Sequence, residues 1–474
     1  MARPQDVNSG ATLLPARPDL IAIKASAGKR GHIRGMWPYF PDLLDRAVPR
    51  YTSYPTAAEF AEGMAEEPYL RQLAAVDPRQ PVSLYVHIPY CREICWYCGC
   101  NTGAAGRAGR LQAYLDALCA EADLVSAALP PGVEVARISF GGGSPNALSA
   151  LQFIRLADHL MTRFRAFSPL FSLELDPRGL DSAWEHAIAG LGIARASLGV
   201  QTLAPHVQSA IGRHQPLEMI ESAVELLRRA GVGSLGFDLM YGLPHQSGAD
   251  LADTIDMALT LQPDRFSVFG YAHLPAAIPR QRRIQGDALP RSRERFEQAM
   301  LADRLLLEAG YVRVGFDHYA KPDDPLARAA GAGGLRRNFQ GFTDDDCDVL
   351  IGLGASAISS FPDLLAQNEK NAGRYRMLVS DGRAPIRRGV LRGPEDQRRG
   401  RLIERILCDG TVSLPADLNA VIGPPLGVFL TRGLATREGD TIALTENGRP
   451  YARALAYLLD GHRAEGEGAF SKAV

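Results

Sequence analysis

Short apolar runs and longer amphipathic stretches alternate along the middle of the chain. The runs contain many β-branched and aromatic residues and end in glycine, proline or polar residues, which is typical of buried strands. The predicted strands are residues 82–88, 135–140, 171–175, 194–200, 233–239, 265–271 and 311–316. Between them, apolar residues at helical spacing predict helices at 110–129, 217–230 and 249–262.

Strands that alternate with helices indicate βα units and a parallel sheet. We therefore predict an α/β fold, a full or partial parallel β/α barrel, with a doubly wound open sheet as the alternative. In both architectures ligands gather at the carboxyl ends of the strands. Residues that can bind ligands or take part in catalysis lie at five of these ends: Cys91, Gly141–Gly143, Glu174 with Asp176, Gln201 and Asp238. The functional site is expected there.

The strand–helix alternation is absent from both ends of the chain. Residues 1–45 show little regular pattern and predict an N-terminal extension, followed by a catalytic domain over 46–380. Residues 381–474 predict a smaller, mostly helical C-terminal domain with a hairpin at 435–444. This order of elements resembles a winged helix, a module that often binds DNA, but no stripe of Lys and Arg follows its helices. A cap over the active site is the interpretation we prefer.

Composition and charge narrow the class of protein. The chain has 474 residues, of which 46% are hydrophobic and 22% charged, as in ordinary globular proteins. Lys and Arg number 52 against 53 Asp and Glu, a balance that argues against a nucleic-acid partner. No apolar run approaches the roughly 18 residues of a membrane span, and no signal peptide is recognisable. We expect a cytoplasmic protein with no membrane partner.

Four of the seven cysteines lie within ten residues, as Cys91, Cys95, Cys98 and Cys100. In a reducing compartment such a group binds metal or performs redox chemistry more often than it forms disulfides. A zinc site is one alternative, but it normally needs a second pair of ligands at a distance. Three cysteines would leave one iron of a four-iron cluster without a protein ligand, so that this iron could coordinate a substrate.

The spacing C-x3-C-x2-C after a first strand resembles the signature of the radical S-adenosylmethionine (SAM) superfamily. The resemblance implies that Cys91, Cys95 and Cys98 hold a [4Fe–4S] cluster and that SAM chelates the open iron. An electron from the cluster then cleaves SAM to methionine and a 5′-deoxyadenosyl radical. Gly141 to Pro145 stand where the superfamily has a glycine loop for the methionine moiety. Cys100 is not expected to be a ligand.

From about residue 47 to 460, the chain resembles more closely the oxygen-independent coproporphyrinogen III oxidase (dehydrogenase) family. The segments that carry the resemblance are RYTSYPT (50–56), SLYVHIPYC (83–91), CGCN (98–101), GGGSP (141–145), LELDPR (173–178), SLGVQ (197–201), FDLMYGLPHQ (237–246), SVFGYAHLP (267–275), DHYAKPDD (317–324) and RNFQGFT (337–343). Departures are small: Ser144 replaces a usual threonine, and Tyr90 and Tyr97 stand where phenylalanine is common.

The resemblance also implies roles for residues outside the cysteine group. The residues expected around SAM are Tyr85, Tyr97, Gly142, Gly143, Ser144, Glu174, Gln201, Arg213, Asp238, Ala272 and Ile358. The residues expected to be catalytic are Tyr85, Glu174, Phe339 and Gln340. His87 is expected to be structural.

The implied reaction converts coproporphyrinogen III to protoporphyrinogen IX, and two SAM molecules are consumed; the family can bind the second beside the first. It also implies an electron donor and an electron acceptor, neither identified by the sequence, and a monomer. Five arginines after the sixth strand are candidates for binding the substrate carboxylates, or else form a solvated face: Arg280, Arg282, Arg283, Arg291 and Arg293. Two alternatives stay open: a haem chaperone of the same superfamily, and another tetrapyrrole-modifying radical SAM protein.

Overall fold

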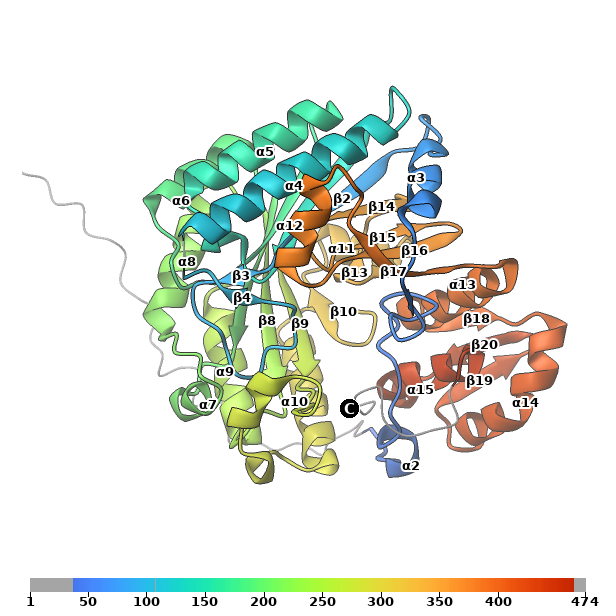
Figure 1. Cartoon of the computed structure of the whole chain (residues 1–474). Coiled ribbons are helices and arrows are strands. Elements are labelled where there is room, and N and C mark those ends of the chain that lie inside the picture. Colours follow the sequence, from blue (N-terminus) through green and yellow to red (C-terminus); the bar gives the residue numbers. More distant parts are fainter. Residues whose placement is uncertain (1–36, 107, 464–474) are drawn as a thin grey trace, which may run out of the picture. The chain divides into compact units, whose positions relative to one another are not determined.

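A computed structural model describes residues 37–106 and 108–463 of the chain. Within them, seven neighbouring strands of one large sheet run parallel (Figure 1). In sheet order they are β14 (Val349–Leu353), β2 (Val82–Ile88), β5 (Val135–Gly142), β6 (Leu170–Leu175), β7 (Arg195–Gln201), β8 (Ser234–Tyr241) and β9 (Arg265–Gly270). The sequence predicts six of these strands, all except β14, with bounds that agree to within two residues at each end. The seventh predicted strand, 311–316, corresponds to β10 (Val312–Val314).

From β2 to β9 the strands occupy the sheet in chain order, as in a β/α barrel, whereas a doubly wound sheet reverses its strand order. Antiparallel strands extend the sheet on both sides. Next to β14 lie β15 (Ile358–Phe361), β16 (Leu364–Asn368), β17 (Ile386–Leu391) and β1 (Ala61–Glu62), and next to β9 lie β11 (His318–Ala320) and β10 (Val312–Val314). Within the described part of the chain, β1 and β10 do not pair, so the barrel is partial.

Alternation along each parallel strand separates a helix-facing side from an inner side. Leu84 and Val86 of β2 are fully buried in the main hydrophobic core, while Tyr85 between them belongs to a separate small cluster with Phe339. In β6, Leu173 and Leu175 are in the core and Glu174 points to the other face. The strands therefore carry polar side chains inside the barrel and apolar side chains beneath the helices.

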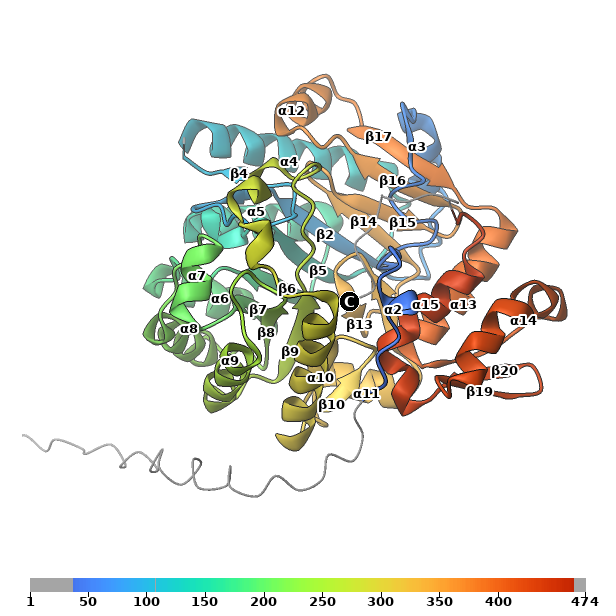
Figure 2. The ribbon, with the colours of Figure 1, turned by 90° about the horizontal axis from the view of Figure 1, so that it is seen from below.

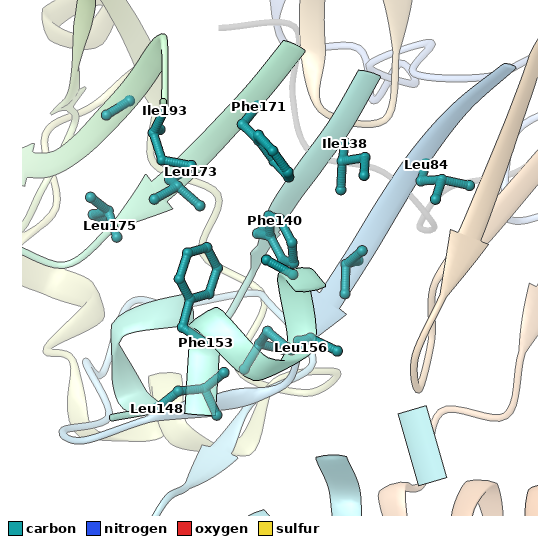
Figure 3. Close-up of a cluster of buried hydrophobic side chains, with 14 of the residues drawn as sticks. Leu84, Ile138, Phe140, Leu148, Phe153, Leu156, Phe171, Leu173, Leu175 and Ile193 are labelled. Atoms are coloured by element: carbon teal, nitrogen blue, oxygen red, sulfur yellow. The ribbon is translucent and has the colours of Figure 1, made fainter. Parts of the chain in front are cut away.

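Amphipathic helices cover the apolar side of the parallel strands (Figure 1). They are α4 (Ala108–Ala128), α5 (Ala150–Phe164), α6 (Ser182–Leu191), α8 (Leu217–Arg229), α9 (Gly248–Thr260) and α10 (Ser292–Glu308). Ser149 caps α5 in a capping box with Gln152, which fixes where this helix begins. Phe153 of α5 then meets Phe140 of β5 edge to face, with ring centroids 4.9 Å apart (Figure 3).

The C-terminal region has its own small core and its own three-stranded sheet. Its elements are α13 (Pro394–Cys408), β18 (Thr411–Ser413), α14 (Ala416–Thr431), β19 (Ala435–Glu438), β20 (Thr441–Leu444) and α15 (Ala452–Ala456). Leu43, Leu44, Tyr51 and Tyr54 pack into this core, with the short helix α2 (Pro41–Leu44) beside α15 (Figure 2). The aromatic segment 50–56 is therefore packed, as its composition indicates.

The expected extension over residues 1–45 lies outside the described residues as far as residue 36. β17 belongs to the large sheet although it lies within residues 381–474. None of the described helices is both long and apolar enough to cross a membrane.

Replacing Phe153 by alanine removes a fully buried ring from the contact between β5 and α5. We expect the free energy of unfolding to fall by about 3–5 kcal/mol. Phe167, which is 92% exposed, provides the matched control, and Phe167→Ala is expected to change it by less than about 0.5 kcal/mol. Urea unfolding followed by circular dichroism measures both, and equal effects would contradict the core assignment.

Candidate active site

Four cysteines line one cavity at the carboxyl ends of the parallel strands. Cys91 lies in β3 (Tyr90–Cys91), directly after β2, and Cys95, Cys98 and Cys100 lie in the loop that follows. The cavity has a volume of about 590 Å³, and we call it the cysteine cavity. The sequence-predicted residues Tyr97, Gly142, Gly143, Glu174, Gln201, Arg213, Asp238 and Ala272 also line it. The barrel thus brings eight predicted cofactor-binding residues and the cysteines together.

The glycines after β5 hold the chain next to Cys91 at close range. The Gly143 N–H donates to Ile88 O, and the Ser144 N–H donates to Tyr90 O, both at 2.8 Å. A Cβ at Gly143 would collide with the Tyr90 main chain. Gly142 has φ +106°, and a Cβ there would lie 2.5 Å from the His87 ring. Side chains at these positions would push the glycine loop away from the cysteines.

Two arginines meet at the thiol of Cys95. Arg213 Nη1 lies 3.2 Å from Cys95 Sγ, and Arg178 Nη2 lies 3.4 Å from it. Asp176, at the end of β6, binds both guanidinium groups: its Oδ2 lies 2.7 Å from Arg178 Nη2 and 3.2 Å from Arg213 Nη1. The two guanidinium groups hold the pKa of the Asp176 carboxyl below its usual range despite its burial. N–H donors of this kind suit a thiolate or a cluster sulfur.

The thiols differ in how readily they lose a proton. Burial raises the pKa of Cys91 to about 12. A hydrogen bond from Cys100 lowers the pKa of Cys98 to about 6 and raises that of Cys100. A metal must therefore displace the proton of Cys91 on binding, while the lowered pKa of Cys98 favours its thiolate form.

Two carboxylates, Glu174 of β6 and Asp238 of β8, face the same cavity. Burial, together with the nearby Asp238 carboxylate, raises the pKa of Glu174 to about 7, and a hydrogen bond from Gln340 offsets this in part. Burial also raises the pKa of Asp238. Carboxyl groups with such raised pKa values gain from a cationic or hydrogen-bond-donating ligand, which stabilises their charged form.

Other predicted residues lie beside the cavity rather than on its wall. Tyr85 Oη is 3.2 Å from His87 Nδ1, and its ring stacks edge to face on Phe339 with centroids 4.7 Å apart. Phe339 and Ile358 line a neighbouring cavity. Ser144 is buried and accepts a hydrogen bond from the Asp176 N–H at 3.0 Å. Burial lowers the pKa of His87 to about 4, so it is neutral, in keeping with a structural role.

The sequence analysis places Asp176 among the strand-end residues without giving it a role, and it does not assign Arg178 to the site. Both belong to the LELDPR segment (173–178), so the signal was present in the sequence. What the sequence did not show is that Arg178 reaches back to Cys95, 83 residues earlier.

A [4Fe–4S] cluster fits this donor set. Three thiols in the required spacing line one cavity with guanidinium N–H donors beside Cys95, and the glycine loop leaves space next to Cys91. Cys100 lines the same cavity, so the choice of Cys91, Cys95 and Cys98 as the ligands stays a prediction.

Comparison with known proteins agrees with this chemistry. Residues 85–258 match the Radical SAM superfamily. Anaerobic coproporphyrinogen III oxidase 1 of Cereibacter sphaeroides is 42% identical, with 89% of this chain and 95% of that protein aligned. The oxygen-independent coproporphyrinogen III oxidase of Escherichia coli is 38% identical over 87% of this chain and 92% of that protein. The solved structure of Escherichia coli coproporphyrinogen III oxidase, described as a radical SAM enzyme, matches with a TM-score of 0.83 and 34% identity, covering 87% of this chain and 98% of that chain.

The partial barrel, its cysteine cavity and the match over residues 85–258 define the class as the radical SAM superfamily. Within that class, the chain belongs to the oxygen-independent coproporphyrinogen III oxidase family.

Replacing Gly143 by alanine tests the close approach of the glycine loop. Because the new Cβ would meet main-chain atoms of Tyr90, the loop must shift, and we expect iron loading after anaerobic reconstitution to fall to less than about half. Gly190→Ala in α6 is the control, because nothing lies within 4 Å of its Cβ position. Iron and sulfide assays on both variants measure the effect. Wild-type loading in Gly143→Ala would refute the steric argument.

Proposed function

We propose that the chain converts coproporphyrinogen III to protoporphyrinogen IX without oxygen, by oxidative decarboxylation of two propionate side chains to vinyl groups in haem biosynthesis. The observation that carries this function is sequence similarity, along nearly the whole chain, to proteins named coproporphyrinogen III oxidase. The same relatives favour it over a haem chaperone or another tetrapyrrole-modifying radical SAM protein. When bound, the [4Fe–4S] cluster and SAM supply the electron and the 5′-deoxyadenosyl radical that the reaction needs.

In this function, Cys91, Cys95 and Cys98 hold the cluster. Arg178 and Arg213 donate N–H groups to Cys95, which disperses negative charge on the sulfur and favours the reduced form of a cluster. The position of the three cysteines on the wall of one cavity, in the spacing C-x3-C-x2-C, supports this assignment.

The glycine loop and the two inner carboxylates bind SAM in our proposal. Gly142 and Gly143 let its methionine moiety approach the main chain, and Glu174, Asp238 and Gln201 accept hydrogen bonds from its ammonium and hydroxyl groups. Arg213 lines the same cavity and would bind the carboxylate of SAM. Tyr97, Ser144, Ala272 and Ile358 complete the proposed SAM site.

Tyr85, Phe339 and Gln340 are the remaining proposed catalytic residues. The contact of Tyr85 with Phe339 and the hydrogen bond from Gln340 to Glu174 link the turn between β12 (Arg336–Asn338) and β13 (Gly341–Thr343) to the cavity wall. This turn is placed to exclude water from the reacting side chain and to hold Glu174 in position.

We also propose a monomer in the cytoplasm, with a separate electron donor and electron acceptor. The catalytic domain would comprise the sheet and its helices, with the C-terminal region after β17 as a cap.

The cysteine assignment predicts different results for neighbouring thiols. Cys91→Ala is expected to lose at least about tenfold in iron content and to form no product, because a cluster lacking one ligand is not retained. Cys100→Ala is expected to keep its iron. Cys119→Ala, in α4 away from the cavity, is the control. Anaerobic assays with dithionite, SAM and coproporphyrinogen III measure iron, 5′-deoxyadenosine and vinyl-bearing product.

In that experiment, full activity of Cys91→Ala would overturn the cluster assignment. Formation of 5′-deoxyadenosine by the wild type without decarboxylated product would overturn the proposed reaction.

The raised pKa of Glu174 predicts a pH dependence of SAM binding. The carboxyl is mostly protonated below its pKa of about 7 and charged above it, so the affinity for SAM should rise several-fold between pH of about 6 and 8. Glu174→Gln should bind SAM more weakly, and its affinity for SAM should no longer rise over this pH range. Glu225→Gln on the exposed face of α8 should keep the wild-type profile. Anaerobic calorimetry at each pH measures the affinities; coincident wild-type and Glu174→Gln profiles would contradict the role.

A further inference from the structure

A second cavity lies between the barrel and the C-terminal region. It is lined by β9, β11, α10, residues Trp37 and Arg50, and the segment around Arg449 to Arg453, and we call it the arginine cavity. In Figure 2, α10, α2 and α15 lie next to one another around this region. Its volume of about 80 Å³ is room for a group of a few heavy atoms and not for a ring system.

Positive charge exceeds negative charge among the described residues of this cavity, five arginines against two aspartates. Arg313 binds both oxygens of Asp303, at 2.6 and 2.8 Å. Asp317 lies 2.6 Å from His318 Nδ1. Arg449 pairs with Glu446 at 3.0 Å. The other three arginines of the wall are Arg50, Arg295 and Arg453.

Arg295 and Arg453 also interact with groups other than a ligand. The feature that distinguishes the arginine cavity is its excess of positive charge. Arg453 is buried and donates to the carbonyls of Val48 and Pro49, which are neutral acceptors. Burial, and then the charge of nearby Arg50, lower the pKa of Arg453 to about 9. Burial also lowers the pKa of Arg295. Guanidinium groups in such a field gain from a bound anion.

The arginine cavity adjoins the cysteine cavity. Arg50, Phe269 and Gly270 belong to the walls of both. Arg50 Nη2 donates to Gly270 O at 2.9 Å. Gly270 has no side chain, and a Cβ there would lie 2.9 Å from Tyr241 Oη and 3.2 Å from Arg295 Nη2. A molecule that extends along this shared wall would therefore reach both cavities.

We propose that the arginine cavity binds the carboxylate of one propionate side chain of the substrate through Arg50, Arg295 and Arg453. This inference rests on the proposed function, which supplies a substrate with four carboxylates. Guanidinium groups bind carboxylates through paired N–H donors. The Trp37 and Phe296 side chains in the wall suit the propionate methylenes.

The arginines suggested by the sequence are placed elsewhere. Arg280 is held by Thr102, at 2.7 Å to its Oγ1, and Arg293 pairs with Glu297 at 3.1 Å. Arg283 lies over the Trp96 ring. None of the five candidate arginines is among the described residues that line either cavity.

Equilibrium binding tests the proposal without turnover. Fluorescence titration of the cluster-loaded protein with coproporphyrin III, the oxidised tetracarboxylic acid, is compared with titration with its tetramethyl ester. Arg50→Met and Arg295→Met are each expected to weaken binding of the acid by about tenfold to a hundredfold, the usual worth of a charged hydrogen bond. Binding of the ester should change less than about twofold, because the ester carries no charge for the arginines to meet.

Matched variants separate charge from packing. Arg50→Lys should recover part of the affinity, and Arg155→Met on the exposed surface of α5 should bind like the wild type. Binding by Arg453→Met is interpreted only if the variant unfolds at the wild-type temperature, because the Arg453 side chain also holds residues 48 and 49.

Wild-type affinity for the acid in both Arg50→Met and Arg295→Met would overturn the proposal. So would equal weakening of acid and ester, or weakening by Arg282→Met alone. Failure of the proposed function is distinguishable, because it would appear as a wild-type protein that binds the acid but forms no vinyl product.

Discussion

One buried guanidinium connects the parts of the active site. Arg213 is 5% exposed, and a buried charge is tolerated only when it is paired and hydrogen-bonded. Its partners come from separate elements: Asp176 after β6, Gly199 O in β7, and Cys95 in the loop after β3. Because each contact offsets part of the same desolvation cost, a shift of any one element leaves the charge under-satisfied. The cysteine loop is thereby fixed to the strand ends.

The two cavities differ in charge, and this difference gives each a preference for its ligand. The cysteine cavity presents Glu174 and Asp238, whose charged forms gain from a cationic ligand such as SAM. The arginine cavity presents mostly guanidinium groups, which gain from an anion. Arg50 and Gly270 lie on the shared wall, so the two ligands would meet where the charge changes sign.

Local patterns predicted the parallel strands and the cysteine group because their signals lie within a few residues of each other. In β2, Tyr85 lies on the opposite face from Leu84 and Val86, as the alternation of side chains along a strand requires. The parallel strand β14 and the antiparallel strands β15 to β17 escaped prediction because they are short and some contain glycines, such as Gly352 in β14 and Gly389 in β17. The place of β14 beside β2, and of the other three beyond it, depends on long-range pairing, which no local pattern reveals.

The arginine cavity, too, could not be predicted from local sequence patterns. The arginines from Arg280 to Arg293 are suggested as substrate-binding residues because they are close together in the sequence. The arginine cavity is assembled instead from Arg50, Arg295 and Arg453, whose proximity appears only in the fold. Asp176 and Arg178 lie in a recognised segment, yet the contact of Arg178 with Cys95 also depends on the fold.

The pairing of the two ends of the described chain sets an order of events during synthesis. Arg453 binds the carbonyl of Pro49, a residue 404 positions earlier. At roughly 5–20 residues per second, about 20–80 s separate the emergence of these partners from the ribosome. The cysteine loop and the parallel strands are complete well within that interval. The arginine cavity therefore forms last, and a chain that ends before Arg449 keeps its cysteines but lacks one wall of this cavity.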